Sequence, residues 1–207
     1  MDYRRTYRAA AIVFADLASR LPAASLDGPG LGEWTMRDLL GHTVSSALRQ
    51  VPAVLADKAP GIVVPVPEGY FALLRLAPTE MVAAARTAAT DDARATGTVL
   101  GDDPAGEISG WIGQATAALA GATDDDVVAT PAGGMRVRDW LPTRTFELVV
   151  HTSDIAAAAG LPVEFDPETL AESAALAARV AAITGSGLTI LRSLTGRGPL
   201  PDGFSIV

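Results

Sequence analysis

The sequence VRDWLPTRTFELVVHTSDIAAAAG, residues 137–160, carries the strongest helical pattern of the chain. Gly160 and Pro162 follow in the positions where these residues commonly end a helix. A polar stripe interrupts the otherwise apolar segment and consists of Arg144, Glu147, His151 and Asp154. These residues share a helix face because they are spaced by three or four positions. Such a stripe is costly inside a helical bundle unless its charges are paired or bind a metal.

On the N-terminal side of this segment, the chain shows further helical patterns. Apolar residues three or four positions apart predict a first helix through Tyr3, Tyr7, Ala10, Phe14, Leu17 and Leu21. Thr35 and Asp38 resemble a capping box at the start of a second helix, which we expect Pro52 to kink or stop. Additional helices are expected over residues 70–76, 79–96 and 106–120, with an extended connector over residues 61–67.

On the C-terminal side, Asp166 and Pro167 mark the start of a last helix that runs to Ile183. The glycine- and proline-rich residues 185–207 are expected to pack as a tail over the bundle. The sequence therefore predicts an all-α protein. Residues 1–162 form a helical bundle, and residues 163–207 form a C-terminal helix and tail that pack on it.

The composition excludes several classes of protein. The 207 residues include 24 Asp and Glu against 16 Lys and Arg, and the resulting net charge of −8 repels a nucleic-acid backbone. Cysteine is absent, so the protein itself supplies no thiol nucleophile and no thiolate ligand. No stretch reaches the roughly 20 apolar residues of a membrane span, and the first helical pattern continues through Asp16 without a signal-peptide cleavage site. We therefore expect a soluble, cytoplasmic protein.

The only two histidines, His42 and His151, define the candidate site. Glu147 and His151 lie four residues apart, a spacing at which two side chains can bind one metal ion. With His42 they would form a set of two histidines and one glutamate. Three protein ligands with an open fourth position are typical of catalytic zinc, although non-haem iron uses the same ligand types. The same spacing also suits a solvated ion pair of Glu147 with His151, and His42 as a capping or core residue.

Two stretches of the chain resemble a known family. They are WTMRDLLGH, residues 34–42, and the later pattern that runs from Arg144 through Glu147, His151 and Asp154 to Gly160. Together they are similar to the metal-binding domain of the mycothiol-dependent maleylpyruvate isomerase family, within the DinB-like superfamily. The resemblance implies a DinB-like four-helix bundle with one long crossover. It also implies a divalent metal, zinc, held by His42, Glu147 and His151.

The resemblance further implies an activity. Mycothiol would supply the sulfur that this chain lacks, and the metal-bound thiolate would attack a small electrophile. The outcome is either thiol transfer or cis–trans isomerisation. Maleylpyruvate itself is not expected as the substrate, because the isomerase that names the family has a further C-terminal domain. The alternative is a non-catalytic bundle that binds metal for stability or acts as a regulatory module.

Two residues of the polar stripe have more than one interpretation. Asp154 is expected either to orient a ligand histidine or to pair with Arg144. Arg144 is expected either to bind a carboxylate of the substrate or to neutralise Glu147 or Asp154. The alanine-rich helical surface is compatible with a homodimer.

Overall fold

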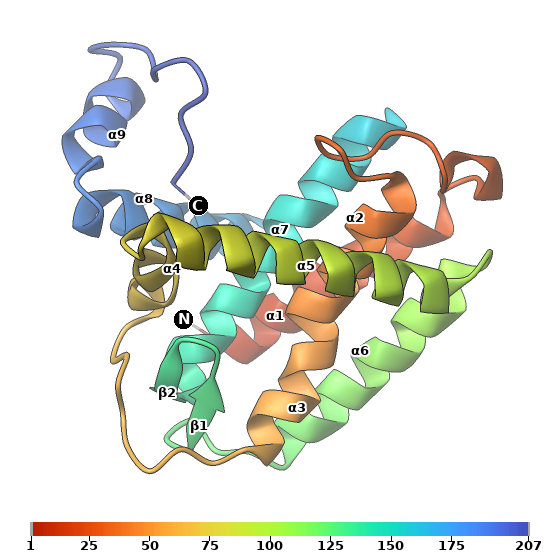
Figure 1. Ribbon diagram of the computed structural model, residues 1–207, viewed down its shortest axis with the longest axis horizontal. Helices are drawn as coiled ribbons and strands as arrows, with labels where there is room; N and C mark the ends of the chain where they lie inside the picture. Colours follow the sequence, from red (N-terminus) through yellow and green to blue (C-terminus); the bar gives the residue numbers. More distant parts are fainter. Residues whose placement is uncertain (1, 207) are drawn as a thin grey trace.

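The computed structural model describes residues 2–206 and confirms the expected all-α class (Figure 1). The elements, in chain order, are α1 (Tyr3–Ser19), a short 3-10 turn (Ala23–Ser25), α2 (Met36–Thr43), a π-helix (Val44–Arg49), α3 (Gln50–Ala56), α4 (Pro67–Arg75), α5 (Thr79–Leu100), α6 (Pro104–Ala120), β1 (Val127–Thr130), β2 (Gly133–Arg136), α7 (Val137–Ala159), α8 (Pro167–Ile183) and α9 (Gly187–Leu194).

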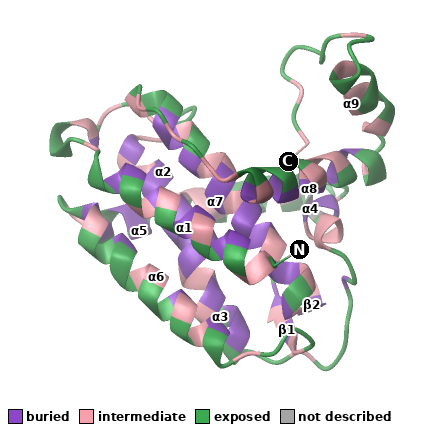
Figure 2. Cartoon of the chain, turned by 180° about the vertical axis from the view of Figure 1, so that it is seen from behind, coloured by how far each residue is buried: buried purple, intermediate pink, exposed green. Residues whose placement is uncertain are grey.

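The hydrophobic core lies between α1, α2, α6 and α7. Helix α1 packs against α6 and α7, and α7 also packs against α2 and α8. Figure 2 shows that buried residues concentrate on the inward faces of these helices. Within the core, Tyr7, Phe14, Leu39 and Trp140 are each at most 1% exposed. Burial of such large apolar side chains is the main favourable term in folding.

The local helix signals of the sequence are confirmed where the structure can test them. Thr35 and Asp38 form a capping box at the start of α2, each side chain accepting a hydrogen bond from the other residue's amide. Asp166 caps α8 by accepting from the amides of Glu168 and Thr169. Helix α7 ends at Gly160, whose φ of 65° is left-handed. Glycine adopts this conformation without steric cost, which explains the sharp end of the helix.

The expected effect of Pro52 is wrong. Instead of kinking or stopping there, the helix widens beforehand into the π-helix Val44–Arg49, and α3 then continues to Ala56. Pro52 lies in α3 directly after the π-helix. The Gln50 amide bonds to the carbonyl of Ser45, five residues back.

A β-hairpin that the sequence analysis did not predict precedes α7. Strands β1 and β2 pair antiparallel, with Val127 opposite Arg136 and Thr130 opposite Gly133. Because β2 leads directly into α7, the hairpin fixes where that helix begins. Val137 continues this connection by donating its amide hydrogen to the Asp126 carbonyl at 3.0 Å.

Helices α2 and α5 cross at two glycines. A Cβ on Gly41 would lie 2.1 Å from the Ala93 carbonyl oxygen and 2.5 Å from the Gly97 nitrogen. A Cβ on Gly97 would lie 2.6 Å from the Arg37 carbonyl oxygen. The two backbones can therefore approach closely only because both positions lack a side chain. This contact places α5 against the turn of α2 that carries His42.

Residues 185–207, which the sequence analysis expects to pack over the bundle, contain the short helix α9. This helix contacts α8 and has no buried residue. Figure 1 shows it projecting from the end of α8 before the chain returns toward the bundle. The left-handed turn at Gly185, with φ of 90°, separates the axis of α9 from that of α8. Phe204 and Ile206 line a groove against Phe146 on α7.

The sequence analysis expects no membrane-spanning segment, and the helices of the structure can be searched for one. Within residues 2–206, none combines the length and apolar character that crossing a bilayer requires.

Candidate metal centre

Three residues from two helices converge where α2 faces α7. One ligand atom each of His42, Glu147 and His151 lies within 4.8 Å of the other two. Glu147 Oε2 is 3.2 Å from His151 Nε2 and 3.9 Å from His42 Nε2. The imidazole rings meet edge to face, with their centroids 4.7 Å apart. Each side chain is 15% or 16% exposed, so the group is mostly enclosed and still reaches solvent.

Asp154 contacts Nδ1 of His151, the ring nitrogen that does not contact Glu147. Its Oδ2 lies 3.2 Å from His151 Nδ1, which leaves Nε2 directed at Glu147. Carboxylates at this position commonly fix the tautomer and orientation of a metal-binding imidazole. The structure describes no ion pair between Asp154 and Arg144, so the geometry favours the orienting interpretation of Asp154 over the pairing one.

The three groups favour different protonation states. Burial and the charge of His151 lower the pKa of His42 to about 4, so this imidazole is neutral at pH 7. Burial opposes ionisation of Glu147, but the hydrogen bond from His151 and the charge of Arg144 outweigh it and lower the pKa to about 2. Burial also opposes protonation of His151, but hydrogen bonds to Asp154 and Glu147 raise its pKa to about 9. In the metal-free protein, His151 therefore carries the positive charge that balances Glu147.

The arrangement fits a small divalent cation. Zinc binds nitrogen and oxygen at roughly 2.0–2.2 Å, so two tetrahedral ligand atoms are separated by about 3.3 Å. The separations of 3.2 Å and 3.9 Å from Glu147 Oε2 are near this value. Among residues 2–206, no other His, Cys, Asp or Glu joins the set. A four-coordinate ion would therefore keep one open position, as catalytic zinc does.

Arg144 lies one turn before Glu147 but makes no ion pair with it in the described chain. The side chain is 1% exposed, and its Nη1 donates to the Ser46 carbonyl at 2.6 Å and to Gln50 Oε1 at 3.1 Å. The ring of Tyr70 covers the guanidinium, 4.7 Å from centroid to Cζ. In the described structure Arg144 therefore does not neutralise Glu147 by direct contact, although its charge lowers the pKa of Glu147 through space. Binding of a substrate carboxylate stays a prediction, and Nη2 is the atom without a hydrogen-bond partner.

Two features lie beside the candidate site. The π-helix Val44–Arg49 follows His42 directly, and such wide turns are frequent at functional sites. The ring of Trp34 lies 4.8 Å from the His42 ring and is tilted by 45° to it. Its Nε1 donates to Thr90 Oγ1 of α5 at 3.3 Å.

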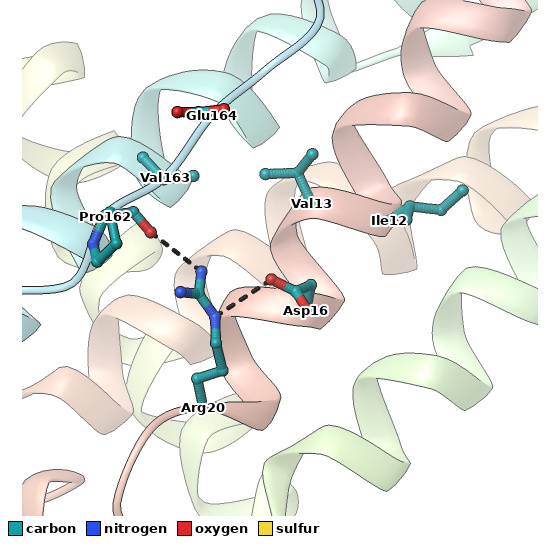
Figure 3. Close-up of a pocket in the computed structure, with 7 residues that line it drawn as sticks. All are labelled: Ile12, Val13, Asp16, Arg20, Pro162, Val163 and Glu164. Carbon is teal, nitrogen blue, oxygen red and sulfur yellow. Dashed lines mark hydrogen bonds and ion pairs between the residues drawn. The ribbon is translucent and has the colours of Figure 1, made fainter.

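A separate groove of about 510 Å³ lies between α1 and residues 162–164, and Figure 3 shows its lining. Arg20 donates to the Pro162 carbonyl at 3.1 Å and pairs with Asp16 at 3.2 Å. These contacts tie the end of α1 to the α7–α8 connection. None of the candidate site residues lines this groove, so it is distinct from the candidate metal centre.

The raised pKa of His151 predicts a pH dependence of the metal-free protein. Protonated His151 stabilises the fold fully below its unfolded pKa of about 6.5, and this contribution disappears as the pH rises toward 9. We expect the unfolding free energy, measured by urea titration with a chelator present, to fall between pH 6.5 and 9. In Asp154→Asn, the fall should be smaller because one partner of the imidazolium is lost. An equal fall in both proteins would contradict the assignment.

Comparisons with known proteins bear on this site. The family described as mycothiol maleylpyruvate isomerase N-terminal domain matches residues 7–156, a range that includes His42, Glu147, His151 and Asp154. The comparisons with curated proteins and with solved structures gave no match. The family match and the helical architecture together support the DinB-like bundle expected from the sequence. Because the match spans more than half of the 207 residues, the chain belongs to the mycothiol maleylpyruvate isomerase N-terminal domain family.

Proposed function

We propose that the protein is a metal-dependent enzyme that uses mycothiol as a thiol cosubstrate and acts on a small electrophile. The observation that carries the proposal is the convergence of His42, Glu147 and His151, whose ligand atoms lie within 4.8 Å of one another in a chain of a mycothiol-linked family. Zinc is the proposed ion, because two imidazoles and one carboxylate with an open position suit catalytic zinc.

The donor set has the charge that thiol chemistry needs. A bound dication supplies Lewis acidity and favours the thiolate form of an incoming thiol near neutral pH. Glu147 contributes one negative charge and the neutral imidazoles contribute none, so the filled centre keeps positive charge. Asp154 holds His151 through Nδ1 and directs Nε2 at Glu147. The sulfur must come from the cosubstrate, because the chain contains no cysteine.

The proposed reaction has two possible products, a trans isomer or a thiol adduct. The thiolate electron pair forms a carbon–sulfur bond with an activated double bond, whose π electrons move onto the adjacent activating group. Rotation about the new single bond and loss of the thiolate then give the trans isomer. Protonation of the adduct instead completes thiol transfer. Arg144 is the proposed anchor for a substrate carboxylate, which would have to reach Nη2, a buried atom without a hydrogen-bond partner in the described structure.

The test combines metal analysis with a thiol assay. Protein purified without chelators or an affinity tag should contain about one zinc per chain by elemental mass spectrometry. It should consume mycothiol, or isomerise a cis α,β-unsaturated keto acid in the presence of mycothiol. Chelation should abolish either activity, and added zinc should restore it. Protein that contains no metal and takes none up would instead support the non-catalytic bundle.

A further inference from the structure

Arg144 connects the two helices that carry the ligands. On α7 it lies three residues before Glu147, and its Nη1 donates at 2.6 Å to the carbonyl of Ser46, four residues after His42. The same nitrogen donates to Gln50 Oε1 at 3.1 Å. The guanidinium therefore bridges the helices about one turn away from a ligand on each side.

The π-helix makes this bridge possible. In an α-helix, the Gln50 amide would bond to the carbonyl of Ser46, four residues back. Here it bonds to the carbonyl of Ser45, five residues back. The Ser46 carbonyl is thereby released from the helical ladder and accepts from Arg144 instead. Wide turns of this kind cost regular hydrogen bonding, and the arginine satisfies the acceptor that is left over.

The buried charge is an expensive way to join two helices. Arg144 is 1% exposed, and the structure describes no carboxylate in an ion pair with it. Its positive charge is stabilised by carbonyl and amide oxygens and by the faces of Tyr70 and Trp140, at 4.7 Å and 5.7 Å. Apolar side chains of similar volume would join the helices at lower cost. The rigid, planar guanidinium group, by contrast, fixes one register of α7 against the π-helix.

We propose that Arg144 is a positioning residue that fixes α7 against the helix of His42, so that Glu147 and His151 stay within reach of the same ion as His42. This inference rests on the proposed metal-dependent function. The separation of 3.9 Å between His42 and Glu147 spans the two helices and depends on their register. Metal sites tolerate deviations of only about 0.2 Å in ligand distance, so a small slip would weaken binding.

Arg144→Met tests the proposal, because it retains apolar volume and removes the donors. Arg4→Met is the matched control: Arg4 joins α1 to the end of α6 through the carbonyls of Leu119 and Ala122, away from the ligands. Zinc affinity, measured by chelator competition, should fall about 10- to 100-fold in Arg144→Met and stay unchanged in Arg4→Met. In the metal-free protein, the nuclear Overhauser effect between the rings of His42 and His151 should weaken only in Arg144→Met.

The outcomes separate this proposal from the proposed function. Wild-type protein that binds no zinc would refute the proposed function, while the ring-to-ring signal would still decide the role of Arg144. Unchanged zinc affinity and an unchanged ring signal in Arg144→Met would overturn the positioning role. If Arg144→Met does not fold, Arg144→Lys replaces it. The lysine ammonium can reach the Ser46 carbonyl but lacks the planar donor geometry of the guanidinium. We therefore expect about tenfold weaker zinc binding in this variant. Wild-type zinc affinity would overturn the proposal.

Discussion

Under the proposed function, replacing His151 with alanine is expected to remove the metal from the protein and, with it, the proposed thiol-dependent activity. His151 offers one of the three candidate ligand atoms, and Glu147 would keep only His42, at 3.9 Å, as a partner in the set. Four-ligand structural zinc sites contribute about 10–16 kcal/mol of binding, or about 3 kcal/mol per ligand. One lost ligand therefore weakens zinc binding by about two orders of magnitude or more.

The control for His151→Ala is Ser153→Ala. Ser153 lies on the same helix two residues later and is exposed, and its hydroxyl donates to the Val149 carbonyl of its own helix. Elemental mass spectrometry should show metal in wild type and Ser153→Ala and none in His151→Ala, with turnover following the metal. Wild-type zinc content in His151→Ala would place the ligands elsewhere in the chain. Retained turnover without metal would remove the ion from the mechanism.

Local sequence signals were sufficient to predict the helices that carry the candidate site. Helix α7 has strong apolar periodicity and a glycine stop, so its extent of Val137–Ala159 matches the prediction. The same periodicity aligned Glu147, His151 and Asp154 on one face, where the structure places them in contact. The meeting of His42 with this face is a long-range contact. Spacing alone left it undecided, and the family resemblance supplied it.

The features that were missed depend on tertiary contacts. Strands β1 and β2 have four residues each, and Gly133 and Gly134 lie in the second, so neither carries a recognisable strand pattern. The π-helix is set by the acceptors that Tyr7 and Arg144 require: Tyr7 donates to the Ala47 carbonyl and Arg144 to that of Ser46. Nothing in residues 44–49 alone indicates this widening. Pro52 was read as a breaker because its position relative to the wide turn was unknown.

A methyl group added at position 41 is expected to destabilise the fold, because Gly41 is buried where α2 crosses α5. In Gly41→Ala, the new Cβ would lie 2.1 Å from the Ala93 carbonyl oxygen and 2.9 Å from Gly97 Cα, which are backbone atoms that no rotamer change can move. Helix α5 must therefore move away from α2. Overpacking of this kind costs about 3 kcal/mol. At roughly 2–4 °C per kcal/mol for a chain of this size, the melting temperature should fall by about 6–12 °C.

The matched control for Gly41→Ala is Gly113→Ala on α6. Gly113 is exposed, and a Cβ there would have no neighbour within 4 Å. Alanine is the better helix former, so this variant should gain about 1 kcal/mol and melt a few degrees higher. Differential scanning calorimetry of both variants gives their melting temperatures. The comparison separates the effect of the clash between α2 and α5 from the general effect of replacing glycine in a helix. Equal melting temperatures would show that α2 and α5 can separate freely. The expected loss in Gly41→Ala alone would instead show that the glycine crossing holds α5, and with it Thr90 and Trp34, against His42.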